Sequence, residues 1–148
     1  MNAEKINVPV LLFSPNYDNL EFIRDKDLLS VTNKLGLKKG IVIGNFIVDS
    51  SGKTYKTIGA KKKGNYHAMW KFEFFNPLIY IELEVEKIND EFGLSELKKR
   101  VLKIIKSDSS EWANYGDVDN IARAIEQSQG YRELIEIIGN HVHPLSAK

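Results

Sequence analysis

The sequence lacks cysteine and has only three histidines in 148 residues. The absence of thiols excludes disulfides, thiolate metal sites and a cysteine nucleophile. Three histidines also leave little material for a zinc site or for general acid–base catalysis. We therefore expect no metal and no cofactor, and a cysteine-free chain is typical of proteins in a reducing cytoplasm.

Long apolar runs are also missing. No stretch approaches the ~18 apolar residues that a membrane-spanning helix needs, and no basic segment leads into an apolar core as in a signal peptide. The net charge is +1, but it is unevenly distributed. Residues 41–75 hold six lysines against two acidic residues, whereas residues 108–148 hold seven acidic residues against three basic ones. This distribution predicts surfaces of opposite charge.

Residues 41–88 have the pattern of an antiparallel β-meander of about four strands. Turn-forming residues separate segments that are rich in β-branched and aromatic side chains. The last segment is the clearest, because Ile79, Ile81, Leu83 and Val85 alternate with polar residues at a period of two. Gly52 is expected to supply a positive φ in the first hairpin turn. The expected strands are 44–49, 53–60, 66–75 and 78–88.

The last third of the chain has helical periodicity. Apolar residues spaced three and four apart predict three helices: one that Ser95 caps and that runs to about residue 106, one that Asp117 caps, and one over residues 131–138. Gly139 is expected to end the last helix at the position after its C-cap. Residues 140–148 are expected to form a flexible tail.

Residues 1–40 are expected to form a strand and helix arm. Pro9 within the apolar segment 8–13 favours an edge strand or an extended arm, and the segment 26–35 has rough helical spacing. Strands come mostly before helices, which favours an α+β fold over a parallel α/β sheet. We expect one α+β domain in which the meander packs against the C-terminal helices.

Two acidic surfaces are candidate binding sites for a basic protein. The first is the polar side of the last strand, where carboxylates recur every second residue, about 7 Å apart. The second belongs to the acidic C-terminal third, where an aromatic residue is either a buried plug or an exposed anchor. The candidate residues are Tyr80, Glu82, Glu84, Glu86, Trp112, Asp117 and Asp119.

Two alternatives remain open at this stage. The lysines at 61–63, with Tyr55, Tyr66 and Trp70 nearby, could form a basic patch with stacking aromatics for nucleic acid. His67 could act as a general base in a small hydrolase if Glu84 orients it. In each case the simpler interpretation is an exposed side of a sheet or a solvated turn.

The segments 44–55 (GNFIVDSSGKTY) and 70–77 (WKFEFFNP), followed by a glutamate-rich strand and C-terminal helices, resemble small bacterial immunity proteins. Such proteins accompany polymorphic toxins, including those of contact-dependent growth inhibition. The resemblance covers about residues 41–138. It rests on the general character of the chain, a compact, cysteine-free α+β domain without enzymatic motifs, because the family shares no catalytic residues.

The resemblance implies a non-enzymatic, cytoplasmic protein that binds and neutralises one cognate toxin domain. Inhibition would be stoichiometric. Many toxins of this kind are nucleases with basic clefts, and an acidic surface would complement such a cleft.

Overall fold

A computed structural model describes residues 5–33, 40, 42–65, 78–88 and 93–142. They form one α+β domain, which confirms the predicted fold class. In the described part of the chain, an antiparallel sheet has the strand order β2-β1-β4-β5-β6-β3, six strands rather than about four. The strands are β1 (Val10–Phe13), β2 (Leu20–Ile23), β3 (Val31–Asn33), β4 (Phe46–Asp49), β5 (Thr54–Asn65) and β6 (Leu78–Lys87).

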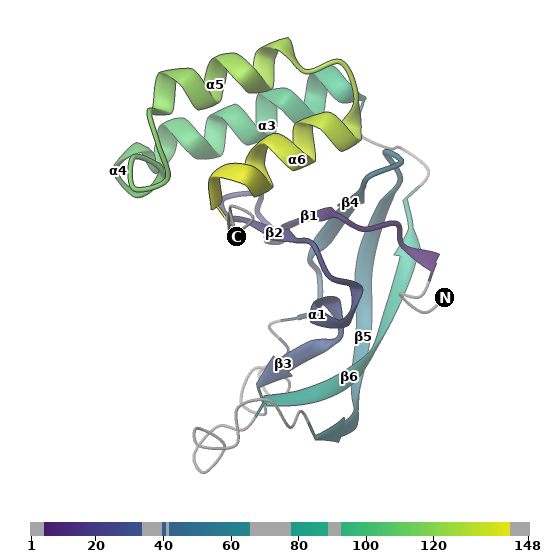
Figure 1. Cartoon of the computed structure of the whole chain (residues 1–148). Coiled ribbons are helices and arrows are strands. Elements are labelled where there is room, and N and C mark those ends of the chain that lie inside the picture. The colour runs from purple at the N-terminus through teal and green to yellow at the C-terminus, as the bar shows by residue number, and fades with distance from the viewer. Residues whose placement is uncertain (1–4, 34–39, 41, 66–77, 89–92, 143–148) are drawn as a thin grey trace, which may run out of the picture.

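The helices are α1 (Lys26–Leu29), α3 (Leu94–Ser107), α4 (Ser109–Trp112), α5 (Val118–Gln127) and α6 (Tyr131–Val142). Figure 1 shows α3, α5 and α6 as a layer at one end of the sheet, with α6 nearest to β1 and β2. In this layer α5 packs against both α3 and α6. Their buried residues meet Leu11, Phe13, Phe22 and Val48 from the sheet in one apolar core, which we call the helix-side core.

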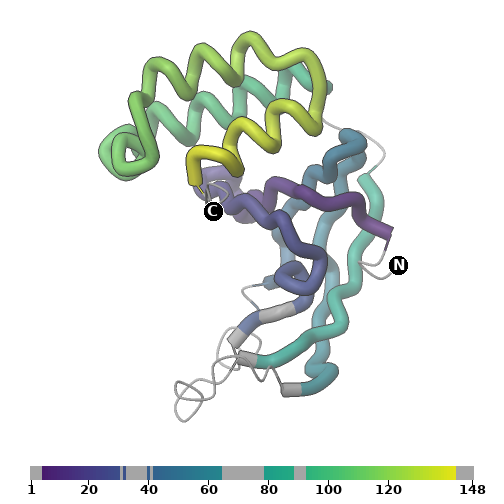
Figure 2. Tube along the Cα trace, viewed as in Figure 1, coloured from purple at the N-terminus to yellow at the C-terminus, as the bar shows by residue number. Residues whose placement is uncertain are grey.

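The opposite side of the sheet is concave. β2 and β3 are the two edges of the sheet, yet α1 joins them directly along the chain. Figures 1 and 2 show α1 between β2 and β3, with β3 beside β6, its partner in the sheet. Leu29 of α1 and Leu83 of β6 therefore belong to a second apolar cluster, the concave-side core. The β5–β6 pair, called the ribbon below, extends beyond the helices, and β3 pairs with β6 at its far end (Figure 1).

The N-terminal arm is part of the sheet, which corrects the expected edge strand. β1 pairs with β2 on one side and with β4 on the other. Pro9 is compatible with this interior place because it precedes the first residue of β1, so its missing N–H removes no ladder bond. The helix expected over 26–35 is only the four-residue α1, and Val31–Asn33 is a strand that pairs with β6.

The β4–β5 turn confirms the role predicted for Gly52, whose φ is +90°. The buried carboxylate of Asp49 organises this turn, since Oδ1 accepts hydrogen bonds from the backbone N–H groups of Ser51 at 2.9 Å and Lys53 at 3.0 Å. The Tyr131 ring packs so closely on Gly52 that a Cβ there would lie 2.6 Å from Cε2. The turn is thereby fixed to the start of α6.

Gly139 and Lys98 make close contacts that position the helices of this layer. Gly139 is buried inside α6, which continues to Val142, so the helix does not end at Gly139 as expected. The Phe22 ring occupies the space that a Cβ on Gly139 would need. Lys98 of α3 donates from Nζ to the Glu126 carbonyl oxygen at 3.0 Å, near the end of α5. A cation at a helix C-terminus satisfies carbonyls that lack intrahelical partners.

The remaining predictions fall partly outside the described residues. The predicted strand 66–75 lies there, and β5 reaches Asn65 and pairs directly with β6. Of the expected tail, 143–148 also lie outside the described residues, whereas Asn140 to Val142 are helical. Of the two predicted N-caps, one is confirmed and one is wrong. Asp117 caps α5 by accepting from the Asn120 N–H, but Gly93, not Ser95, precedes α3.

Candidate partner-binding surface

The side chains of β6 alternate between the concave-side core and solvent. Ile81, Leu83 and Val85 are buried, whereas Glu82, Glu84 and Glu86 between them are exposed. A strand directs successive side chains to opposite faces, and so the three carboxylates share one face. This side of the β5–β6 ribbon is called the outer ribbon face. It consists of Tyr80, Glu82, Glu84 and Glu86 of β6 and Lys56, Ile58, Gly59, Lys61, Lys63 and Gly64 of β5.

The register of the ribbon places lysines beside the glutamates. Lys61 is opposite Glu82, and Lys56 is opposite Glu86. The Lys61 Nζ lies 3.3 Å from the Glu82 carboxylate, with 75% and 49% of the two side chains exposed. Exposed ion pairs contribute about 0–1 kcal/mol to stability. The surface predicted to be acidic therefore carries mixed charge, because Lys56, Lys61 and Lys63 equal Glu82, Glu84 and Glu86 in number.

A β-bulge adds an apolar element to this face. Ile58 and Gly59 together oppose Glu84, because the register shifts between Thr57 and Gly59. A Cβ on Gly59 would lie 3.0 Å from the Glu84 Oε2, so the carboxylate lies over the glycine. Ile58 itself is 44% exposed. Sequence reasoning missed this residue because its exposure depends on the bulge.

A second exposed isoleucine lies next to the bulge in the hydrogen-bonding pattern. The Gly44 N–H donates to the Thr57 carbonyl at 2.8 Å. Ile43 and Ile58 are each one residue from that bond, and Ile43 is 45% exposed. The exposed Ile58 beside a row of carboxylates gives the outer ribbon face an apolar side chain with polar surroundings, as in many binding sites.

At the boundary with the helices, charged and aromatic side chains form a stack. The Arg100 guanidinium lies 4.2 Å from the Tyr17 ring centroid, and Tyr17 stacks on Phe46 at 4.7 Å and 19°. The Lys56 Nζ lies 5.7 Å from the Phe46 centroid. Burial raises the pKa of Tyr17, and the positive charge of Arg100 opposes that rise. The stack joins α3 to the start of the ribbon through favourable cation–π contacts.

The other predicted site residues lie elsewhere and serve the fold. Trp112 is 6% exposed and belongs to the helix-side core, so it is not an exposed anchor. The Asp117 carboxylate accepts a hydrogen bond from the Asn120 N–H at 3.1 Å. Asp119 is exposed in the first turn of the same helix. Figure 1 places α4 and α5 in the helical layer, away from β6. The structure therefore does not bring the two predicted acidic surfaces together.

The two alternative chemistries gain no support from the described residues. Lys61 to Lys63 lie in strand β5, and Tyr55 is buried in the concave-side core. Tyr66, His67, Trp70 and His143 lie outside the described residues. Within the described residues no three His, Asp or Glu side chains are grouped so that they could hold a metal ion.

Comparisons with protein-family models, with curated proteins and with solved structures found no match. The resemblance to immunity proteins therefore stays a prediction. In the described part of the chain, the helices are too short or too polar to cross a membrane.

Proposed function

We propose that this protein is a binding module that recognises a basic protein partner through the outer ribbon face. The observation that carries the proposal is the row of exposed carboxylates on β6 beside the exposed Ile58. Charge complementarity accelerates association, and an apolar side chain buried at the centre of an interface supplies much of the affinity.

The packing of the ribbon supports an interface that is already formed before the partner binds. Its concave face is packed with Ile81, Leu83 and Val85, and this packing fixes the direction of the glutamates between them. Gly59 adds no side chain to the face and leaves room for the Glu84 carboxylate. A partner that docks here meets side chains on a paired strand, so little conformational entropy is lost on binding.

The partner that fits best is the toxin domain of a bacterial competition system, and the protein is then its cytoplasmic immunity protein. A nuclease toxin has a basic cleft for its substrate, and a row of carboxylates complements such a cleft. Binding there blocks substrate access, so one immunity protein inhibits one toxin without catalysis. The resemblance in the sequence points to the same class of partner.

The first experiment is co-purification of the tagged protein from its native source, with mass spectrometry of the bound material. We expect a stoichiometric partner that is the C-terminal domain of a large secreted protein. Recovery of RNA or DNA without a protein partner would contradict the proposal.

The second experiment measures affinity for that partner by biolayer interferometry. The double variant Glu82→Lys, Glu84→Lys should bind at least tenfold more weakly, largely through slower association. The matched control is Asp119→Lys, which reverses an exposed carboxylate in the helical layer. Equal affinities of the two variants would exclude the outer ribbon face as the interface.

A further inference from the structure

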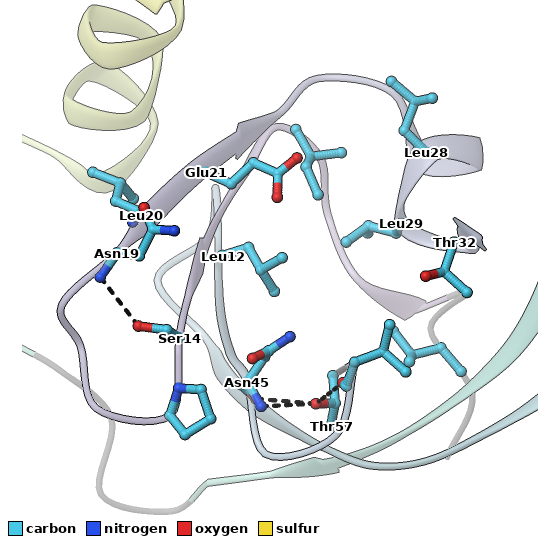
Figure 3. A pocket seen from close by; sticks show the side chains of 14 residues that line it. Leu12, Ser14, Asn19, Leu20, Glu21, Leu28, Leu29, Thr32, Asn45 and Thr57 are labelled. Carbon is cyan, nitrogen blue, oxygen red and sulfur yellow. Dashed lines mark hydrogen bonds between the residues drawn. The ribbon is translucent and has the colours of Figure 1, made fainter. Parts of the chain in front are cut away.

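The concave side of the sheet contains a cavity that is separate from the outer ribbon face. Its volume is about 420 Å³, and its lining residues come from β1, β2, β3, β5, β6, α1 and the turns beside them. Figure 3 shows Leu12 and Glu21 on one side, with Leu29 and Thr32 across from them and Asn45 and Thr57 beyond. A volume of this size falls within the roughly 300–1,000 Å³ typical of small-molecule sites.

The cavity has a mostly aliphatic wall. Leu12, Ile23, Leu29, Val42 and Leu83 all line it. Several of its polar groups are already used within the protein. The Thr57 Oγ1 donates to the Val42 carbonyl at 2.6 Å, and the Ser14 Oγ donates to Asp18 at 2.6 Å. A ligand in this space would mainly contact methyl and methylene groups.

Of the described residues that line the cavity, one has a charged side chain, and it is acidic. Glu21 is opposite Leu12 in the β1–β2 register and two residues from Ile23, so it lies on the concave face beside aliphatic residues, and it is exposed to solvent there. Within the described part of the chain its carboxylate has no hydrogen bond or ion pair, and the Thr32 hydroxyl likewise lacks a side-chain hydrogen bond. Among the described residues that line the cavity there is no lysine or arginine. An anion would therefore be repelled, and a cation would find a partner.

We infer that this cavity binds a primary alkylammonium group, with the ammonium paired to Glu21 and the alkyl chain against Leu12 and Leu29. The ammonium supplies three donors to a carboxylate that has no partner within the protein. The alkyl chain removes apolar surface of the cavity wall from water. The Thr32 hydroxyl is available to a second polar group on a longer ligand. This inference does not depend on the proposed function, because the two surfaces lie on opposite faces of the sheet.

The test is a titration of the full chain with n-butylammonium, followed by ¹H–¹⁵N NMR. We expect saturable shifts at the amides of the lining residues, and affinity at least tenfold higher than for 1-butanol, because hydrogen bonds to charged groups are the stronger ones. Equal binding of 1-butanol and n-butylammonium, or no saturation with either, would overturn the inference.

Variants locate the charge that is responsible. Glu21→Gln keeps the shape of the side chain and should lower the n-butylammonium affinity about tenfold, while leaving the weak 1-butanol response unchanged. Glu84→Gln on the outer ribbon face is the matched control and should bind as the wild type does. Loss of binding in Glu84→Gln to the same extent would place the cation elsewhere and overturn the site.

A second ligand distinguishes a free amine from a lysine side chain. N-acetyl-lysine-N-methylamide carries the same ammonium and alkyl chain, attached to a peptide backbone. Binding as tight as that of n-butylammonium would assign the cavity to a lysine of a protein partner. Binding of n-butylammonium alone would assign it to a small free amine, because the opening would then reject the backbone.

Discussion

One face of the sheet has two different environments along its width. In β1 and β4 this face carries Leu11 and Val48, which are fully buried beneath the helices. In β6 the same face carries Glu82 and Glu84, which are exposed. The strand pairing is continuous between the two regions, and so the secondary structure does not distinguish them. The side chains on this face change from apolar to charged where the helical layer ends.

The two regions also differ in what stabilises them. The β1–β2–β4 half is packed on both faces, by the helix-side core and by the concave-side core. The ribbon is packed on its concave face alone. Burial of apolar area contributes about 25 cal/mol per Å², and therefore most of the folding free energy belongs to the half beneath the helices. The ribbon is left with a face on which substitutions are tolerated.

The largest expected effect comes from removing a buried side chain in the covered half. Leu11→Ala should lower the free energy of unfolding by about 2–5 kcal/mol, because it leaves a cavity beneath the helices. Glu84→Ala on the same face of the ribbon should change it by less than about 0.5 kcal/mol. Urea denaturation measures both. Similar losses in the two variants would remove the distinction between the regions.

A smaller effect is expected where α6 crosses β2. Gly139→Ala should lower stability by about 1–3 kcal/mol, because the new methyl group overlaps the Phe22 ring, even though alanine favours the helix. Gly130→Ala is the matched control, since a Cβ there meets nothing within 4 Å. Phe22→Leu should recover part of the loss in the Gly139→Ala background. A neutral or stabilising Gly139→Ala would show that α6 lies farther from β2.

The smallest effect is expected at Tyr17, where the two regions meet. Its pKa is raised above 10.0 by burial, so its contribution to stability is complete below pH 10 and is lost as the pH rises through the higher folded-state value. Tyr17→Phe should remove this alkaline loss, which solvent screening limits to below about 1 kcal/mol. Denaturation at several alkaline pH values, with the exposed Tyr115→Phe as control, measures it. An unchanged pH profile in Tyr17→Phe would contradict the assignment.

The three longer C-terminal helices were the most predictable part of the fold. Their apolar residues recur over three or more turns, and Asp117 is a local capping signal, so periodicity was sufficient for α5 and nearly so for α3. β6 was found for the same reason, because ten residues allow the alternation to repeat. β2 and β3 have only four and three residues. Such short segments carry too little periodicity to separate a strand from an irregular helix.

Contacts between distant segments could not be predicted. The lysines of β5 and the glutamates of β6 were recognised separately, but only the strand register brings Lys61 to Glu82. Ile58 depends on a bulge, and Gly139 depends on Phe22, which lies over one hundred residues earlier. The cavity containing Glu21 arises from the curvature of the sheet. None of these features has a local signal in the sequence.

The strand order also determines when the sheet can be completed during synthesis. β3 follows α1 early in the chain, yet its partner is β6. Residues 31–33 can therefore pair only after residues 78–80 have been synthesised. At about 5–20 residues per second that wait is roughly 2–10 s. Until then the aliphatic residues that β1 and α1 contribute to the concave-side core lack the β6 residues that pack against them. The nascent chain therefore carries an exposed apolar hairpin out of the ribosome, and the sheet reaches its final curvature only when β6 arrives.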